Sequence, residues 1–498
     1  MRRYPFIFFV ALLLMGAKES KMKKANIRID LSKVEYTMKG GLGASWHAIS
    51  REMPLNNEKY IIKAREKNPR GSAYGGNPPL SDTAVWNQLR NYAGWLGMNF
   101  IRVEISQRMY EPEQGQFDWD NDEMKALYAI LDWCEENNAD VFLQQMWANV
   151  GWNAIPGIHP LISAPKNPDT YTDGIATMVE YLTRTKGYNC IKYFCMTNEP
   201  PGGTWGDWWE YGGTKGSIED SWKLLKEKFD KQKISVKISG PDWTDMPPFD
   251  PSKLEMASGF GSIDIHSYQG VTPEGQENLS RWAAWAHNQG KPFFLTEFGN
   301  MRLGWGEDNP GPKTFAAALS DASDVIRGIH AHVDGFNRWS FTNRGDLDGQ
   351  WQLVHTWDRD KKQYLDAATP EPAAYYGFGI ISRFLSKYSS SVSCISDMPD
   401  SVVNSAALVS PDGELSIFMV NYEKEPVKVK FNIASLPDDK MISIYQITEK
   451  LVSEPGYELK PVKQFSSKKL KRVLLPPESI TTITSYTLTD NNKGIILK

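Results

Sequence analysis

Short apolar segments alternate with longer amphipathic segments over most of the chain, from about residue 40 to about residue 386. The long segments place apolar residues at helical spacing and end in polar residues or glycine, as at 122–138, 172–187 and 314–330. The short segments are nearly continuously apolar, which indicates strands that are buried on both faces. Eight such segments end at the following residues: His47, Ile105, Trp147, Glu199, Gly240, Tyr268, Phe298 and Phe341.

Eight buried strands that alternate with helices predict an α/β fold, namely a closed (β/α)8 TIM barrel with its helices outside. An open, doubly wound sheet is the alternative. It is disfavoured because no glycine-rich phosphate-binding loop follows an early strand. The glycine-rich GGLGAS segment at 40–45 lies ahead of a strand and inside it, and does not open a helix.

The pattern changes after residue 386 to short alternating runs that are separated by turn signals such as the PDG at 411–413. Short strands at regular spacing without helices predict a C-terminal β-sandwich domain. The alternating segment ANIRIDLS near the N-terminus is expected to join this sandwich. We therefore expect a signal peptide at 1–19, an N-terminal strand at 24–36, a catalytic barrel at 37–387 and the β-sandwich at 388–498.

The first residues carry two arginines, an apolar run from Phe6 to Met15 and then small residues. This arrangement predicts a secretory signal peptide, because the run is too short to cross a bilayer. We expect the mature chain to be secreted or periplasmic, without membrane insertion. No cysteine follows the apolar run, so we expect no lipid anchor.

Composition and charge narrow the class of partner. The net charge is −4 over 498 residues, without the basic excess that a nucleic-acid backbone requires. The chain has 18 Trp, 21 Tyr and 21 Phe, more than a core alone normally needs. Flat aromatic faces suit sugar rings, so an oligo- or polysaccharide is the expected partner. The four cysteines lack metal-ligand spacing and are expected to be buried free thiols; neither a metal nor an organic cofactor is expected.

In a parallel barrel, the carboxyl ends of all strands open onto one face. Two carboxyls, Glu199 and Glu297, lie at such ends after apolar strands, where burial makes a charge costly. Cleavage of a glycosidic bond needs this pair, because one carboxyl must protonate the leaving oxygen while the other, ionised, attacks or stabilises the anomeric carbon. We expect Arg102 to keep one carboxyl ionised and Glu199, close to Trp and Pro, to have the raised pKa.

Several short motifs follow one another at the expected strand ends: TNEP at 197–200, HSY at 266–268, TEFG at 296–299, and Trp339. In this order they resemble the retaining glycoside hydrolases of the (β/α)8-barrel clan A. The GLGAS segment and the N-terminal strand that joins the sandwich are most similar to family 30, and NEP and HSY are shared with family 5. At the third strand, where many family 5 members have a histidine, this chain has Gln145 and Trp147.

The resemblance implies a role for each matching residue. Glu297 would be the nucleophile, and Glu199 would act first as general acid and then as general base. Asn198 would bind the sugar hydroxyl beside the anomeric carbon, while Arg102 and Tyr268 would hold Glu297 ionised and aimed. The other candidates for contact with substrate are His266 in the pocket wall, Trp339 under the reacting sugar, Trp147 and His47.

The sequence therefore predicts a secreted retaining β-glycoside hydrolase that cleaves a plant or microbial β-glycan by double displacement. Endo action is favoured because many tryptophans, among them Trp205, Trp208 and Trp209, fall in loops at strand ends. An exo-acting β-glycosidase is the alternative within this class. A non-catalytic carbohydrate-binding protein is the alternative from another class, and the presence of both glutamates and Asn198 speaks against it. The β-sandwich is expected mainly to brace the barrel.

Overall fold

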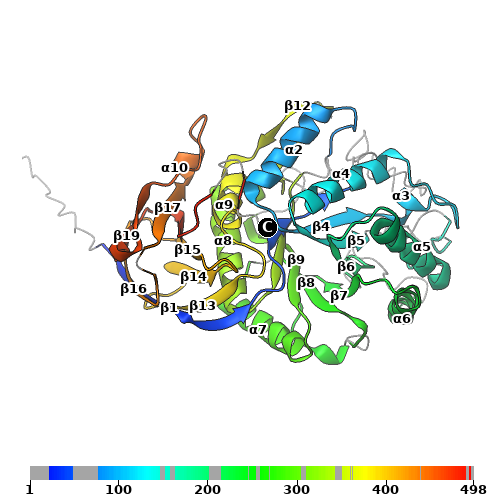
Figure 1. Cartoon of the computed structure of the whole chain (residues 1–498), viewed down its shortest axis with the longest axis horizontal. Helices are drawn as coiled ribbons and strands as arrows, with labels where there is room; N and C mark the ends of the chain where they lie inside the picture. The colour runs from blue at the N-terminus through cyan, green and yellow to red at the C-terminus, as the bar shows by residue number, and fades with distance from the viewer. Residues whose placement is uncertain are drawn as a thin grey trace, which may run out of the picture.

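The computed structural model describes residues 22–48, 77–145, 152–156, 163–200, 215–244, 246–253, 258–268, 270–303, 310–342, 350–358, 361, 363–437, 439–488 and 493–494. Within these ranges a parallel, barrel-like sheet is surrounded by helices, and a second, mainly antiparallel sheet lies beside it (Figure 1). The α/β class is confirmed, and the first sheet has the parallel pairing that the predicted TIM barrel requires.

Nine strand segments make up the barrel sheet: β2 (Leu42–Ala44), β3 (Trp46–His47), β4 (Phe100–Ile105), β5 (Asp140–Gln145), β6 (Ile191–Cys195), β7 (Lys237–Trp243), β8 (Ser262–Ser267), β9 (Phe293–Phe298) and β10 (Gly335–Arg338). The two ends of this strand order are β2, which pairs with β10, and β3, which pairs with β4. In the sequence, only Ser45 separates β2 from β3. Together they form the first of eight strands and close the barrel.

The sequence predicts the first strand as one unbroken run ending at His47, whereas the structure divides it at Ser45. The division arises because the strand changes its neighbour there, from β10 to β4. Gly43 lies where β2 crosses the start of β4, and a Cβ at this position would overlap the carbonyl oxygen of Phe100. Glycine is therefore required at the seam for the backbones to approach.

Helices cover the outside of the barrel: α2 (Thr83–Leu96), α3 (Gln107–Tyr110), α4 (Asp122–Glu136), α5 (Pro168–Glu180) with a π-helical turn at Tyr181–Thr185, α6 (Lys215–Gln232), α7 (Pro273–Asn288), α8 (Phe315–His330) and α9 (Pro372–Ser382). Their starts follow the sequence, since the side chains of Asn121, Asn167, Thr272 and Thr314 accept hydrogen bonds from first-turn N–H groups. Short elements complete this part: 3-10 turns at Pro251–Lys253, Met301–Leu303 and Gly311–Lys313, and the strand pair β11 (Val354–Asp358) and β12 (Gln363–Pro370).

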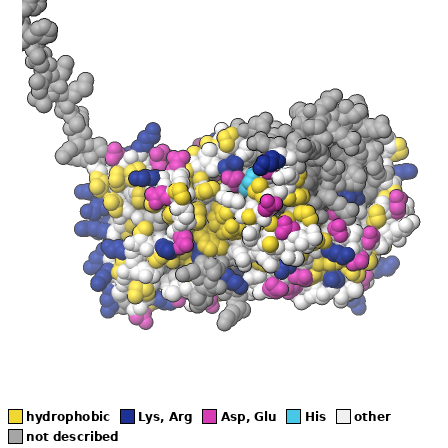
Figure 2. All heavy atoms as spheres, turned by 90° about the horizontal axis from the view of Figure 1, so that it is seen from above, with side chains coloured by type: hydrophobic (Ala, Val, Ile, Leu, Met, Phe, Trp, Pro, Cys, Tyr) yellow, Lys and Arg dark blue, Asp and Glu magenta, His cyan; other side chains and the backbone are white. Residues whose placement is uncertain are grey.

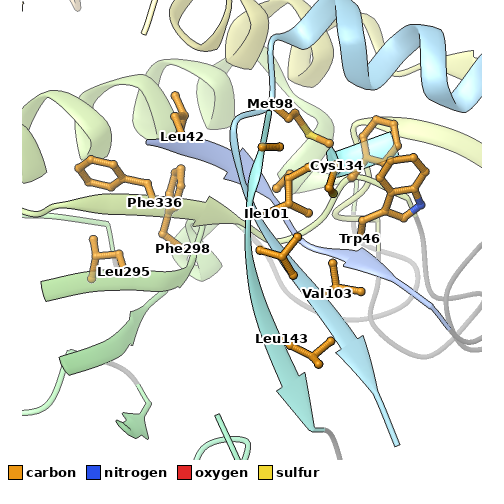
Figure 3. Close-up of a cluster of buried hydrophobic side chains, with 14 of the residues drawn as sticks. Leu42, Trp46, Met98, Ile101, Val103, Cys134, Leu143, Leu295, Phe298 and Phe336 are labelled. Carbon is orange, nitrogen blue, oxygen red and sulfur yellow. The ribbon is translucent and has the colours of Figure 1, made fainter. Parts of the chain in front are cut away.

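Strand alternation decides which side chains meet the helices. In β4, Ile101 and Val103 belong to the large buried cluster that includes Trp46 and Cys134 (Figure 3), whereas Phe100 belongs to a separate cluster inside the barrel. Burying each large apolar side chain stabilises the fold by roughly 1.5–3 kcal/mol. As expected, all four cysteines are buried free thiols.

The second sheet has nine strands in the order β18-β17-β20-β15-β14-β13-β1-β16-β19. Its members are β1 (Lys24–Thr37), β13 (Ser390–Ser396), β14 (Val403–Val409), β15 (Leu415–Asn421), β16 (Val427–Ala434), β17 (Met441–Thr448), β18 (Lys463–Ser466), β19 (Arg472–Leu475) and β20 (Ser479–Thr484), with the short helix α10 (Glu449–Val452) after β17 and a 3-10 turn at Ser467–Lys469 after β18. The N-terminal strand β1 is antiparallel to β13 and parallel to β16. Side chains from both halves of this order, including Ile27, Ile417 and Val429, pack into one buried cluster.

The outer face at one end of the second sheet is basic. Figure 2 shows lysine and arginine side chains gathered at this end, on the left of the view. In β16, Lys428 and Lys430 are exposed, while Val427, Val429 and Phe431 are buried. This period-two alternation keeps the charged side chains in water and supplies the apolar face that the cluster buries.

Helices α8 and α9 lie between the barrel and the second sheet: α8 contacts β14 and β15, and α9 contacts β17 and β20. Although α9 is mostly buried, it has only 11 residues, and no helix in the described part of the chain is long and apolar enough to cross a membrane. Gly377 allows α9 to approach α8, since a Cβ at this position would overlap the Cβ of Ala318.

We predict that Gly377→Ala lowers the free energy of unfolding by about 1–3 kcal/mol, because the added methyl group overpacks the contact between α8 and α9. The matched control is Gly94→Ala in α2, where the nearest heavy atom to an added Cβ is 3.9 Å away. That change gains helix propensity and raises stability by up to about 1 kcal/mol. Urea denaturation of both variants checks the prediction, which fails if the two substitutions shift stability in the same direction.

Candidate active site

The inside of the barrel has two layers: a layer of mainly aromatic side chains, and a polar layer nearer the carboxyl ends of the strands. Phe100, Phe142, Tyr193 and Phe294 form a buried aromatic layer together with Cys195. Two residues further along their strands, the alternating faces carry polar groups, such as Arg102 after Phe100. The aromatic layer fills the lower barrel, so the polar side chains gather at the carboxyl ends of the strands, as in other barrels of this kind.

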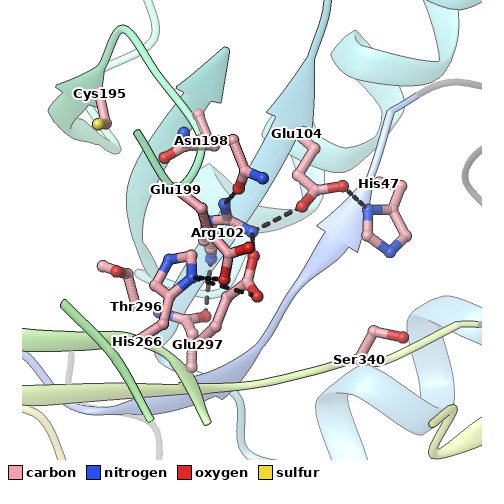
Figure 4. A network of polar contacts seen from close by, with 12 residues as sticks. His47, Arg102, Glu104, Cys195, Asn198, Glu199, His266, Thr296, Glu297 and Ser340 are labelled. Atoms are coloured by element: carbon pink, nitrogen blue, oxygen red, sulfur yellow. Dashed lines mark hydrogen bonds and ion pairs between the residues drawn. The ribbon is translucent and has the colours of Figure 1, made fainter. Parts of the chain in front are cut away.

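The guanidinium of Arg102 lies at the centre of this polar group and is fully buried (Figure 4). Its Nη1 lies 2.6 Å from Glu104 Oε1 and 2.5 Å from Glu297 Oε1, and its Nη2 donates to Asn198 Oδ1 at 2.8 Å. Burial opposes the positive charge, but the carboxylates of Glu297 and Glu104 outweigh it and raise the pKa of Arg102. The guanidinium therefore joins β4, β9 and the segment after β6 into one network.

Glu297 reaches this network because β9 is irregular at Thr296. The register shifts by one residue between Leu295 and Glu297 against β8, and β9 also has one extra residue against β10. Regular alternation would point Glu297 to the same side as Phe293 and Leu295, towards the helices. The extra residue turns the carboxyl towards the pocket, as bulges beside active sites commonly do.

Two further groups hold the carboxyl of Glu297. The hydroxyl of Tyr268 donates to Oε2, and Nδ1 of His266 lies 3.4 Å from the same oxygen. Burial raises the pKa of Glu297 to about 7, while Arg102 and His266 act in the opposite direction. Arg102 favours the ionised form of Glu297, as expected from the sequence, but burial outweighs it and the pKa of this carboxyl is raised.

Glu199 lies four residues beyond the end of β6 and is partly exposed, with 17% of its side chain accessible. Its backbone has φ = 53°, a left-handed conformation that costs a residue with a side chain about 1–3 kcal/mol. The N–H of Glu199 donates to Asp242 Oδ2 at 3.1 Å, and its Oε1 lies 2.7 Å from His266 Nδ1. Contacts to both backbone and side chain thus fix this carboxyl.

The two glutamates face each other across His266. An oxygen of Glu199, an oxygen of Glu297 and a ring nitrogen of His266 all lie within 4.8 Å of one another. Retaining glycosidases have carboxyl groups about 5–5.5 Å apart, whereas inverting enzymes leave about 6.5–9.5 Å for a water molecule. Oxygens that approach within 4.8 Å are close enough for the retaining arrangement.

Aromatic side chains border the network. The ring of Trp339 lies 5.7 Å from the guanidinium carbon of Arg102 and 4.9 Å from the ring of His47. His47 also pairs with Glu104 through Nδ1, which links it to Arg102. Trp351 packs edge-on against Tyr268 with ring centroids 5.6 Å apart. Trp339, Tyr268 and Trp351 form one small apolar cluster beside the carboxyls.

The structure brings eight of the nine predicted site residues together: Glu199, Glu297, Arg102, Asn198, His266, Tyr268, Trp339 and His47. The ninth, Trp147, lies outside the described residues, as do Trp205, Trp208 and Trp209. Three neighbours were not among the predicted site residues: Glu104, Asp242 and Trp351. The sequence places Glu104 two residues after Arg102 and Asp242 at a strand end, and either position could have indicated a role.

Two groups among the described residues are compact enough to hold a metal ion: Glu199 with His266 and Glu297, and Cys195 with Asp242 and Asp264. In the first group, burial opposes a charge on His266, but Glu297 and Asp242 outweigh it and raise its pKa well above the usual value. In the second group, burial raises the pKa of the Cys195 thiol and of Asp264.

Comparison with solved structures identifies the fold. A glycoside hydrolase family 30 subfamily 8 xylanase from Clostridium acetobutylicum is 16% identical, with 92% of this chain and 99% of that chain covered at a TM-score of 0.60. The endo-β1,6-glucanase BT3312 is 13% identical, with 93% and 94% covered at 0.59. A family 39 β-xylosidase from Caulobacter crescentus is 14% identical, with 92% and 99% covered at 0.58. At these identities the likeness shows a shared fold.

No curated protein matches the sequence significantly. A family model does match, the one described as Cellulase (glycosyl hydrolase family 5), over residues 78–343. This range contains the TNEP, HSY and TEFG motifs and Trp339, so the predicted resemblance to clan A is confirmed. Because the match spans more than half of its length, the chain belongs to the cellulase family, glycosyl hydrolase family 5.

Proposed function

We propose that this retaining O-glycosyl hydrolase cleaves internal linkages of a plant or microbial β-glycan, with Glu297 as nucleophile and Glu199 as acid/base. The observation that carries the assignment is the convergence of the two carboxyls on His266, with oxygens within 4.8 Å. Their surroundings differ, because Glu297 is paired with Arg102 and Tyr268 whereas Glu199 contacts His266 and is partly exposed. Such asymmetry is what two roles for two carboxyls require.

In the first step, a carboxylate oxygen of Glu297 forms a bond to the anomeric carbon while the bond from that carbon to the leaving oxygen breaks. The carboxyl of Glu199 gives its proton to the leaving oxygen, so no free alkoxide forms. Arg102 and Tyr268 keep the lone pairs of Glu297 directed, and Asn198, held by Arg102, is available to the hydroxyl beside the anomeric carbon.

In the second step, the carboxylate of Glu199 takes a proton from water, and the water oxygen bonds to the anomeric carbon. The ester bond to Glu297 breaks and its carboxylate returns. The two inversions together retain the configuration of the sugar. Since Glu199 begins protonated and ends protonated, the cycle is balanced without any other reactant.

The choice between internal and terminal cleavage depends on the walls of the site. Internal cleavage is supported by the many tryptophans that follow the strand ends in sequence and could form several stacking subsites. The shared fold does not decide, since it is found in a xylanase, an endo-β1,6-glucanase and a β-xylosidase. Terminal cleavage by an exo-acting β-glycosidase is the second candidate.

We also propose that the protein is exported from the cell, with residues 1–19 as its signal peptide. Export through residues 1–19 is supported by their arginines and apolar run.

We further propose that the second sheet folds as a two-layer sandwich that braces the barrel. Support comes from its single buried cluster, which joins strands from both halves of the sheet order, and from the contacts of α8 and α9 with its strands.

Product release from a panel of β-glucans, xylans, mannans, galactans and aryl β-glycosides tests the function. We expect turnover of at least one member, and a loss of at least about 10⁴-fold in Glu297→Gln because the nucleophile is removed. The matched control, Glu277→Gln on the exposed side of α7, keeps full activity. A glycan that both the wild type and Glu297→Gln bind without turnover would instead support a carbohydrate-binding protein.

The pH dependence tests the role of Glu297. Since the nucleophile must be ionised and burial raises its pKa to about 7, kcat/KM is expected to fall as the pH drops through that value. Tyr268→Phe removes a hydrogen bond that favours the ionised form, so the pKa of Glu297 rises and the acidic limb moves up by about one pH unit, equivalent to about 1.4 kcal/mol.

The matched control for this experiment is Tyr193→Phe, a buried tyrosine of the aromatic layer that lies below the site. Its acidic limb is expected to stay in place. A limb that moves to lower pH in Tyr268→Phe, or that does not move, would contradict the assignment of Glu297 as the ionised nucleophile.

A further inference from the structure

Asp242 is a buried carboxyl behind the proposed acid/base, with none of its surface exposed. It lies near the end of β7, where the register against β8 shifts between Pro241 and Trp243. Its own backbone has φ = 59°, which is uncommon for a residue with a side chain. As at Glu297, an irregular strand end turns a carboxyl into the barrel.

Asp242 contacts Glu199 by two separate routes. Its Oδ2 accepts the backbone N–H of Glu199 at 3.1 Å, which satisfies the main chain in its left-handed conformation. Its Oδ1 lies 3.0 Å from Nε2 of His266, and the other ring nitrogen of His266 lies 2.7 Å from Glu199 Oε1. One carboxylate thus sets both the backbone and the side chain of Glu199.

We propose that Asp242 is the positioning residue of the acid/base: it holds His266 with both ring nitrogens donating, so that Nδ1–H occupies Oε1 of Glu199 and leaves Oε2 to carry the catalytic proton. This inference rests on the proposed function of Glu199. A neutral histidine with its proton on Nε2 would present a lone pair to Glu199 and could take the proton meant for the substrate.

The charges around His266 support a doubly protonated ring. The groups that face it are Asp242, Glu199, Glu297 and Tyr268. Asp264 also interacts with it electrostatically, and Arg102 is paired with Glu297. Although burial opposes the charge, Glu297 and Asp242 outweigh it and raise the pKa of His266. Burial also acts against a charged Asp242, but the adjacent imidazolium outweighs it and lowers the pKa of this carboxyl.

Asp264 is the next carboxyl in the barrel and a neighbour of Asp242, and its surroundings favour the protonated form. Burial and the neighbouring Asp242 raise its pKa well above the usual value. Ser239 donates to its Oδ1 at 2.6 Å and Thr296 to its Oδ2 at 3.3 Å. In the described part of the chain, no hydrogen bond joins Asp264 to either glutamate. Asp264→Asn therefore replaces a carboxyl that favours its neutral form with a neutral amide of nearly the same shape. Asp242→Asn has the same shape change but removes a negative charge.

The test compares Asp242→Asn, Asp264→Asn and Glu199→Gln on two aryl β-glycosides of the sugar that the wild type hydrolyses. Dinitrophenolate is a good leaving group and departs without help from an acid. The phenolate of the phenyl glycoside is a poorer leaving group and must receive a proton as it departs. We expect Asp242→Asn to lose at least about tenfold in kcat/KM on the phenyl glycoside, part of the roughly 10²–10⁴-fold that general acid catalysis contributes. On the dinitrophenyl glycoside its glycosylation step is expected to be nearly unchanged, and Asp264→Asn should behave like the wild type on both.

The outcomes distinguish a failure of the positioning role of Asp242 from a failure of the acid/base role of Glu199. If Glu199→Gln shows the dependence on the leaving group and Asp242→Asn loses both substrates equally, Asp242 is merely structural and the inference is wrong. If Glu199→Gln shows no such dependence, the proposed role of Glu199 is wrong. Asp264→Asn with the same pattern as Asp242→Asn would show that the effect is not specific to Asp242.

A spectroscopic measurement on the same proteins does not depend on turnover. The ¹⁵N chemical shifts of His266 at neutral pH should show two protonated ring nitrogens in the wild type and in Asp264→Asn. Asp242→Asn should show one protonated nitrogen, because the anion that stabilises the imidazolium is gone. A neutral His266 in the wild type would overturn the inference.

Discussion

The arrangement of the site depends on one buried cation. The guanidinium of Arg102 has no exposed surface, and moving a charge from water into an apolar barrel costs several kcal/mol unless partners surround it. Its partners come from three places in the sequence: Glu104 on the same strand, Glu297 on β9 and Asn198 after β6. Because an unpaired buried charge is so unfavourable, a folded barrel must bring these strand ends together, and the proposed nucleophile is among the groups that neutralise the cation.

Regular barrel geometry alone would not have produced this site. Alternation directs aromatic rings into the lower barrel and excludes water below the charges. The carboxyls above them are placed by departures from regularity: an extra residue at Thr296, a register shift at Asp242, and the left-handed backbone of Glu199. Hydrogen bonds from Asp242, His266 and Tyr268 hold the two glutamates at these irregular positions.

The same division explains what the sequence could and could not predict. Apolar runs and helical spacing predicted the barrel strands and the main helices, because burial depends on residue type and period. Strand ends predicted Glu199, Glu297 and most of their neighbours, because all strands of a parallel barrel open onto one face. The orientation of Glu297 was not predictable, since the FFLTEF pattern gives no sign of an extra residue at Thr296. The break at Ser45 also depends on which neighbour the strand meets, and that is decided by tertiary contacts.

The position of the N-terminal strand has a consequence for modular engineering. β1 lies inside the second sheet, between β13 and β16, although the rest of that sheet follows the barrel in sequence. A chain truncated after the barrel would leave β1 with two open edges and would uncover the apolar sides of α8 and α9. Open edges and bare apolar helices invite self-association. Recombination between relatives must therefore exchange the barrel together with both of its flanking segments.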